Sequence, residues 1–414
     1  MFSLFSGSDP KAPNFHPAVT SKTPPGQLFS PLESKDLEWT CAGGFVTETQ
    51  TWYNFLQDGT LLWCQIIHSA VGLWYPQIQF TCRIFDPKTK ETTWKSINIT
   101  GFVTPPPGKD KRSSKSDQFT VTLAPGTGEF AEQYEINANL EDIQLALKIS
   151  RPSSAQGFKV GNGHSYFGTD LNKPEGYVVH RFWPRTQCSG AVIKSGQVIE
   201  ANGVGMFVHA IQGMRPNLVA ARWNFCNFQS SDEAVSAIQM EFTTIGAYGR
   251  EGAGSGGVSV NLGGVVVGGK LVCVTGETHW PSEAPVADAP VQSRAVHLGR
   301  VTDPETGYKQ PSQVQFTWVA PGVGDAAPVK AELTADVGTP DAPKGLVQKV
   351  DVLGEIPTAL KMVISYAAGT KPYIYQWLNP GTLSVTGPES LIPGGSKTFN
   401  GTVYNEATFI SESD

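Results

Sequence analysis

Aromatic, cationic and amide side chains are interleaved between residues 164 and 228, with few carboxylates among them. Aromatic rings of this kind bury apolar surface, while arginine, asparagine and histidine supply hydrogen bonds. A block of this composition can hold the polar head of a ligand whose remainder is apolar. We therefore take as candidate ligand-binding residues Tyr166, His180, Trp183, Arg185, Phe207, His209, Arg215, Arg222, Trp223 and Asn224.

The role of His209 is open at this point. In a strand, alternation places His209 and Phe207 on one face. A histidine in that position is either a satisfied core residue or a group that hydrogen-bonds a ligand head or acts as a general acid. The polar groups of the block either hold backbone at a junction between two halves of the chain or bind a ligand amide or hydroxyl. Those alternatives apply to Arg215, Arg222, Trp223 and Asn224.

Several chemistries find no support in the sequence. The run Gly252–Gly257 fits a GxGxxG pattern, but a strand-like segment follows it where a dinucleotide site needs a helix. The chain has neither a Walker motif nor a GxSxG elbow, and its seven histidines lack HxH or HxxxH spacing. We therefore predict no catalytic residue, no metal site and no cofactor.

Composition and charge narrow the class of protein. The chain has 414 residues, with 44 glycines and 30 prolines, a mix that suits short strands and tight turns better than helices. A formal net charge of -6 argues against a nucleic-acid partner. The six cysteines form no CxxC pair, and we expect reduced, mostly buried thiols.

The first 36 residues contain six prolines and predict a mostly irregular tail. Its start lacks the basic region and long apolar run of a secretory signal, so we expect a protein that is not secreted. The start is either a disordered or packed end of the tail, or a short interfacial anchor in which Phe2, Leu4 and Phe5 dip into a membrane surface. Because these first few residues together have little apolar area, that membrane contact would be transient.

Period-two alternation of apolar residues begins near residue 39 and predicts strands with one buried face. The clearest runs start at Ile78, Phe119, Ile143, Ile238, Val258 and Val314. Turn signals separate the runs, among them Asp58-Gly59, Asn202-Gly203, Pro393-Gly394 and Asn400-Gly401. This pattern predicts an all-β protein made of antiparallel barrels or sandwiches.

The length predicts two units of similar size. We place an N-terminal tail at residues 1–36, a first barrel at 37–214 and a second barrel at 215–414. A helix is expected from Glu355 to Gly369, because Pro357 suits a first turn and Gly369 a C-terminus. We expect that helix to pack against a barrel.

Further motifs carry a family resemblance. They are Phe167–Asp170, Phe182–Arg185, Val208–Met214, Ala220–Gln229, Met240–Thr244, Asp303–Gly307, Gly369–Gln376 and Asn405–Ser411. Together they resemble the fungal survival factor 1 family from about residue 40 to the C-terminus. The resemblance implies tandem lipocalin-like (calycin) barrels with few short helices, and a non-catalytic protein that carries ceramide or related sphingolipids between endoplasmic reticulum and Golgi membranes.

The resemblance also implies a role in survival under oxidative stress, a cytoplasmic location at the periphery of those membranes, and a nuclear fraction. We expect a monomer. The alternative is an enzyme on a double-calycin scaffold, a terpenoid hydratase or a cyclase with an apolar pocket. Such an enzyme would use His209, His180 or Tyr166 as its acid or base.

Overall fold

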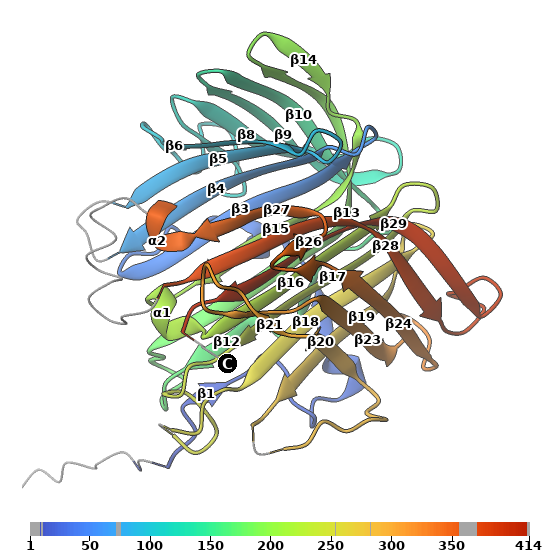
Figure 1. The fold of residues 1–414 in the computed structure, drawn as a ribbon. Helices are drawn as coiled ribbons and strands as arrows, with labels where there is room; N and C mark the ends of the chain where they lie inside the picture. Colours follow the sequence, from blue (N-terminus) through green and yellow to red (C-terminus); the bar gives the residue numbers. More distant parts are fainter. Residues whose placement is uncertain are drawn as a thin grey trace, which may run out of the picture.

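The computed structural model describes residues 9, 11–71, 76–252, 254–281, 283–355 and 371–411. These residues form an almost entirely β structure in which two antiparallel sheets pack against each other (Figure 1). The helices within the described ranges are short: α1 (Pro216–Val219), α2 (Val352–Glu355) and the 3-10 turns η1 (Pro25–Gln27) and η2 (Ser34–Leu37). The predicted all-β class with few short helices is confirmed.

The first sheet is antiparallel and runs in the order β6-β5-β4-β3-β15-β13-β10-β9-β8-β7. Its strands on this path are β3 (Phe45–Leu56), β4 (Leu61–Val71), β5 (Gln77–Asp86), β6 (Glu91–Asn98), β7 (Ser114–Lys115), β8 (Phe119–Pro125), β9 (Phe130–Leu140), β10 (Ile143–Pro152), β13 (Gly176–Lys194) and β15 (Gly203–Gln212). Short strands at its margin are β1 (Phe15–His16), β2 (Phe29–Pro31), β11 (Phe158–Val160), β12 (His164–Phe167) and β14 (Gln197–Glu200).

The two ends of this sheet meet, so the sheet closes as a barrel. The backbone N–H of Asp117 donates to the Thr100 carbonyl at 3.0 Å, and Val103 and Lys115 exchange two backbone hydrogen bonds of 2.8 and 3.0 Å. These bonds join the segment after β6 to β7 and the start of β8.

The second sheet is also antiparallel and runs in the order β19-β18-β17-β16-β29-β28-β24-β23-β20, with β27 beside β28. Its strands are β16 (Arg222–Ser230), β17 (Val235–Thr243), β18 (Ser259–Val267), β19 (Lys270–His279), β20 (Gln292–Leu298), β23 (Gln313–Pro321), β24 (Pro328–Asp336), β27 (Leu346–Asp351), β28 (Tyr373–Thr386) and β29 (Ser396–Phe409). Two small ribbons pair β21 (Val301–Thr302) with β22 (Lys309–Gln310), and β25 (Gly338–Thr339) with β26 (Ala342–Pro343). The backbone N–H of Val323, just after β23, donates to the Val272 carbonyl in β19 at 2.9 Å, which draws the ends of the sheet together as a second barrel.

The alternation read from the sequence matches the strands. The runs that begin at Ile78, Phe119, Ile143, Ile238, Val258 and Val314 lie in β5, β8, β10, β17, β18 and β23. In β10 every second residue from Ile143 to Ile149 is buried while the intervening residues to Lys148 are exposed. The run Gly252–Gly257 leads into strand β18, which confirms that no helix follows it.

One turn prediction is wrong. Asn400 and Gly401 lie inside β29, where they pair with Thr382 and Gly381 of β28. A Cβ atom at Gly401 would lie 2.4 Å from the Gln229 carbonyl oxygen. The glycine therefore serves a close approach between strands and not a hairpin turn.

The described part of the N-terminal tail packs on the body of the protein. β1 pairs with β12 and β2 with β11, and Phe15, Val19 and Leu28 are buried. The Thr278 hydroxyl of β19 donates to the Val19 carbonyl at 2.6 Å, so the tail contacts both sheets.

The predicted boundary between residues 214 and 215 lies between β15 and β16, where the chain passes from the first sheet to the second. The division into two domains at this boundary stays a prediction. Phe2, Leu4 and Phe5 lie outside the described residues, as does the helix predicted from residue 355 to 369 apart from its first residue.

Candidate functional site

The interior of the first barrel brings together three of the candidate residues. Register pairs Phe207 of β15 with Trp52 of β3 and with Trp183 of β13. One step along the same faces, His209 pairs with Gln50. Paired residues in neighbouring strands point to one side of a sheet, and here that side is the interior.

Four aromatic rings meet at this level. The Tyr134 ring of β9 lies 5.3 Å from Trp52, 5.1 Å from Trp183 and 5.1 Å from Phe207, measured between ring centroids. All four residues are fully buried. Rings at such separations attract each other beyond the effect of burying their area. The four rings therefore pack as one layer, which we call the aromatic floor.

Polar atoms around this floor lack partners. Examples on fully or almost fully buried side chains in the described part of the barrel are Gln50 Oε1, Trp52 Nε1, Asn54 Oδ1, Tyr134 Oη, Trp183 Nε1 and Thr186 Oγ1. Buried polar groups in native proteins are paired in the large majority of cases. Each one left without a partner costs about 1–3 kcal/mol. A polar ligand group or buried water molecules can complete these hydrogen bonds.

Burial raises the pKa of Tyr134 far above its ordinary value, and a hydrogen-bonding interaction with the Gln50 side chain lowers it by a smaller amount. The phenol therefore stays protonated and can donate a hydrogen bond. With the indole N–H groups of Trp52 and Trp183, it gives the site three donors. Gln50 and Asn54 each present an amide oxygen as an acceptor.

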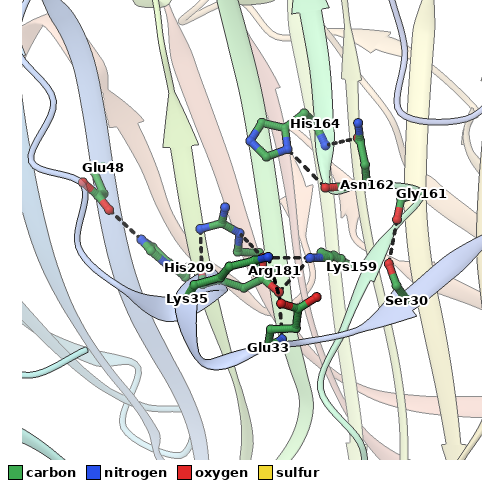
Figure 2. Close-up of polar contacts among 11 residues, drawn as sticks. Ser30, Glu33, Lys35, Glu48, Lys159, Gly161, Asn162, His164, Arg181 and His209 are labelled. Carbon is green, nitrogen blue, oxygen red and sulfur yellow. Dashed lines mark hydrogen bonds and ion pairs between the residues drawn. The ribbon is translucent and has the colours of Figure 1, made fainter. Parts of the chain in front are cut away.

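We call the segment from residue 33 to 41 the plug; it lies beside Lys159, Arg181 and His209 of the first barrel (Figure 2). The Asp36 carboxylate accepts two hydrogen bonds of 2.8 Å from Lys159 and lies 3.8 Å from Arg181. The Arg181 guanidinium also donates to the Asp36 carbonyl. Leu37 and Trp39 of the plug join the apolar interior of the barrel. Buried ion pairs and apolar contacts therefore hold the plug against the first barrel.

A second anchor of the plug involves Glu48 and His209 at the end of the interior (Figure 2). The Glu48 carboxylate accepts hydrogen bonds from the backbone N–H groups of Thr40 and Cys41, at 2.9 and 2.8 Å. Burial acts to raise the pKa of Glu48, but the hydrogen bonds from His209 and Thr40 outweigh it and lower that pKa. The carboxylate is therefore ionised at neutral pH.

His209 lies between two acceptors. Its Nε2 is 2.8 Å from the Glu48 carboxylate and its Nδ1 is 3.1 Å from the Asp36 carbonyl oxygen. Because both partners can only accept, both hydrogen bonds form when the ring carries two protons. His209 thus links the barrel wall to the plug through both ring nitrogens.

Three other candidate residues lie at the seam between the barrels. Arg185 donates to the Gln229 amide oxygen at 3.1 Å and to the Val235 carbonyl at 3.0 Å. The His180 ring is 6.0 Å from that of Trp223. Burial lowers the pKa of His180 to about 4, so this ring is neutral at neutral pH. These residues hold the two barrels in register.

The remaining four candidates are dispersed. Asn224 lies inside the second barrel, where it donates to Glu241 at 2.8 Å, and Arg222 approaches the same carboxylate to 3.9 Å. Tyr166 is half-buried and stacks on His164, and Arg215 is exposed with its guanidinium 4.3 Å from the centroid of the Phe45 ring. The block therefore supplies residues to two interiors, a seam and the surface.

This dispersal bears on catalysis. His209, His180 and Tyr166 lie in the first interior, at the seam and on the margin strand β12. An acid and a base must both reach one reacting group within hydrogen-bond distance. No two of these three residues form such a pair.

Sequence reasoning missed half of the interior site. Gln50, Trp52 and Asn54 alternate with Thr51 and Tyr53 on β3, and they share one face. A run of polar residues interrupted by tryptophan at core spacing is a signal that was available in the sequence. Tyr134 and Asp36 gave no comparable signal, because only the closed barrel brings them to the site.

Within the described ranges, no group of three or more histidine, cysteine or acidic residues is placed to bind a metal. The same ranges contain no helix of the length and apolarity needed to span a membrane. All six cysteines are free thiols and all but Cys41 are buried. Surface depressions of about 440 and 400 Å³ lie on the outside of the first barrel and between β14 and the β3–β4 turn, away from the interior site.

Fold and site together define a tandem antiparallel barrel protein with a sealed, partly polar interior. The chain matches the Svf1 family over residues 4–411, and it belongs to that family. It is 32% identical over 387 residues to the ceramide-binding protein svf1 of Schizosaccharomyces pombe, which covers 92% of this chain and 90% of that protein. It is 33% identical over 406 residues to the ceramide-binding protein SVF1 of Yarrowia lipolytica, covering 95% and 92%.

Solved structures give weaker likenesses. Kievitone hydratase from Nectria haematococca aligns with a TM-score of 0.49 and 10% identity, covering 97% of this chain and 99% of the enzyme. The protein CghA aligns with a TM-score of 0.49 and 9% identity, covering 89% of each chain. Likenesses at this level support no statement about the activity of this chain.

Proposed function

We propose that this protein binds a ceramide-like lipid without transforming it, and that the polar head of the lipid sits in the first barrel. The observation that carries the proposal is the set of buried polar atoms without partners around the Trp52, Tyr134 and Trp183 rings. The names of the relatives supply the ligand class.

The chemistry of the head matches the site. A ceramide carries one secondary amide and two or more hydroxyl groups, so it offers both acceptors and donors. Its amide oxygen can accept from the indole N–H groups of Trp52 and Trp183 or from the Tyr134 hydroxyl. Its hydroxyls and amide N–H can donate to Gln50 and Asn54.

The acyl chains require an apolar environment, which the rest of the same interior provides. Each buried methylene contributes about 0.8 kcal/mol to binding. Apolar side chains further along the barrel are Leu56, Leu62, Leu140, Ile143, Leu145 and Val192. A barrel of roughly eight strands suits one small ligand.

Loading and release then require the plug to move, because Leu37 of the plug accepts a hydrogen bond from Gln50 in the polar layer and packs into the same interior. A carrier that exchanges its lipid at a membrane would combine plug release with a transient contact made by Phe2, Leu4 and Phe5. The family resemblance supports exchange between endoplasmic reticulum and Golgi membranes by a cytoplasmic monomer, with a nuclear fraction and a role under oxidative stress.

Extraction of lipids from the purified native protein, followed by mass spectrometry, tests the proposal. We expect an N-acyl sphingoid lipid in the wild-type extract and much less of it in the extract of the Trp183→Phe variant. Tyr166→Phe is a matched control, because Tyr166 lies outside the interior. Equal amounts of lipid from Trp183→Phe and wild type would rule out this site, and an extract without lipid would refute lipid binding.

A further inference from the structure

The interior of the second barrel contains a hydrogen-bonded row of polar side chains. The row consists of Thr275, Ser293, Asn261, Glu241, Asn224 and His297, linked by contacts of 2.7 to 3.1 Å. Its members come from β16, β17, β18, β19 and β20, so the row runs along the inner face of the barrel across five strands.

Four of the five links in this row have a defined direction, and the Thr275–Ser293 hydroxyl contact is the fifth. Burial lowers the pKa of His297 to about 3, so its ring is neutral and its Nε2–H donates to the Asn224 amide oxygen. Asn224 and Asn261 donate to the Glu241 carboxylate, and the Ser293 hydroxyl donates to Asn261. The second interior thus satisfies its polar groups in this row through protein contacts alone.

The neighbouring layer differs. Asn405 of β29 lies opposite Trp377 of β28 on one side and Cys226 of β16 on the other. Asn405 and Trp377 are both fully buried. In the described part of the chain, Asn405 Nδ2, Asn405 Oδ1 and Trp377 Nε1 have no hydrogen-bond partner.

These three atoms define a complementary ligand group. Two N–H donors and one amide oxygen on paired strands fit a group that accepts twice and donates once. The amide of an N-acyl lipid, or that amide with an adjacent hydroxyl, has this character. On the same faces, beyond Asn379, Gly381 and Gly401, the apolar residues Val403, Phe399, Leu383 and Val385 provide surface against which an acyl chain can be buried.

We propose that the second barrel is a second binding site for an amide-bearing lipid, with the lipid head at Asn405 and Trp377. The ligand class rests on the proposed function of the first barrel, whereas the site rests on its own unpartnered atoms. The protein therefore binds two lipid molecules per chain.

Native mass spectrometry of protein loaded from detergent micelles with N-palmitoyl sphingosine counts the bound lipids. We expect two lipids on wild type, one on Asn405→Leu, and an affinity for the second lipid about tenfold weaker on Trp377→Phe, which loses one hydrogen bond. Trp183→Phe should weaken binding of the other lipid and leave the Asn405 site filled. Circular dichroism checks that each variant is folded. If Asn405→Leu does not fold, the affinity measured for the milder Trp377→Phe variant tests the second site.

One lipid on wild type, with the count and affinity unchanged in Asn405→Leu and Trp377→Phe, would overturn the second site while leaving the first intact. That result would assign the three atoms to a buried water molecule. Binding of no lipid by wild type would instead refute the proposed function itself.

Discussion

The exchange Tyr134→Phe should change stability and lipid binding in opposite directions. The Tyr134 hydroxyl is fully buried and makes no well-aligned hydrogen bond in the described structure, where the Gln50 side chain is its polar neighbour. Its removal keeps the three ring contacts at 5.1–5.3 Å and deletes only the unpaired polar atom. An unsatisfied buried polar group costs about 1–3 kcal/mol, so the lipid-free variant should be more stable by up to that amount.

The same exchange should weaken lipid binding. If the hydroxyl donates to the lipid head, its loss costs a hydrogen bond of about 0.5–1.5 kcal/mol, which corresponds to a roughly 2- to 13-fold higher Kd. Thermal unfolding of delipidated protein measures the first effect, at about 2–4 °C per kcal/mol for a unit of about 200 residues. Titration with a fluorescent ceramide analogue measures the second.

Tyr166→Phe is the control for both measurements, because Tyr166 is half-buried on β12 and stacks on His164 outside the barrel. It should leave stability and affinity nearly unchanged. Lower stability of lipid-free Tyr134→Phe, together with unchanged affinity, would refute the reasoning. It would mean that the hydroxyl is satisfied within the apo protein.

The remaining predictions concern the plug, pH and one glycine. Lys159→Met leaves the Asp36 carboxylate, 4% exposed, without its 2.8 Å partner, so we expect a loss of about 3–5 kcal/mol and faster proteolysis within residues 33–41. Unchanged cleavage kinetics would argue against the plug anchor. The pKa values of Glu48 and Asp36 are lowered in the folded protein, so the stability they contribute is present at neutral pH and is lost as pH falls below the ordinary range near 4.5. Melting temperatures from pH 7 to 3 should show that loss, with a shallower decline in Glu48→Gln; parallel curves would contradict it. Gly401→Ala places a methyl group 2.4 Å from a backbone oxygen of the neighbouring strand and should destabilise the second barrel, whereas Gly43→Ala meets no atom within 4 Å and should be neutral. Equal melting temperatures of these two variants would contradict the close approach.

The sequence predicts strands well where burial alternates. The run from Ile143 to Ile149 is an example, because each inward residue is apolar and each outward one is small or polar. The turn predicted at Asn400-Gly401 is wrong because an Asn-Gly pair suits a hairpin turn and a close strand contact equally well. Only the packing of β29 against β16 distinguishes the two cases.

The candidate site was predictable in part. Trp183, Phe207 and His209 do share one interior, since they come from adjacent strands in the sequence block. Arg185 does not lie on that face because the register of β13 against β15 shifts between Trp183 and Thr186. The local sequence pattern does not predict such a bulge. Asp36 reaches the site through a plug whose position depends on contacts across more than a hundred residues.

The most direct test of lipid binding in the first barrel is a crystal structure of the protein purified with its native lipid. We predict density for an amide-bearing head within hydrogen-bond distance of Trp52, Tyr134 or Trp183, and an acyl chain along the apolar interior. A lipid held only at the outer surface or along the seam, with the first interior filled by protein side chains alone, would contradict the account.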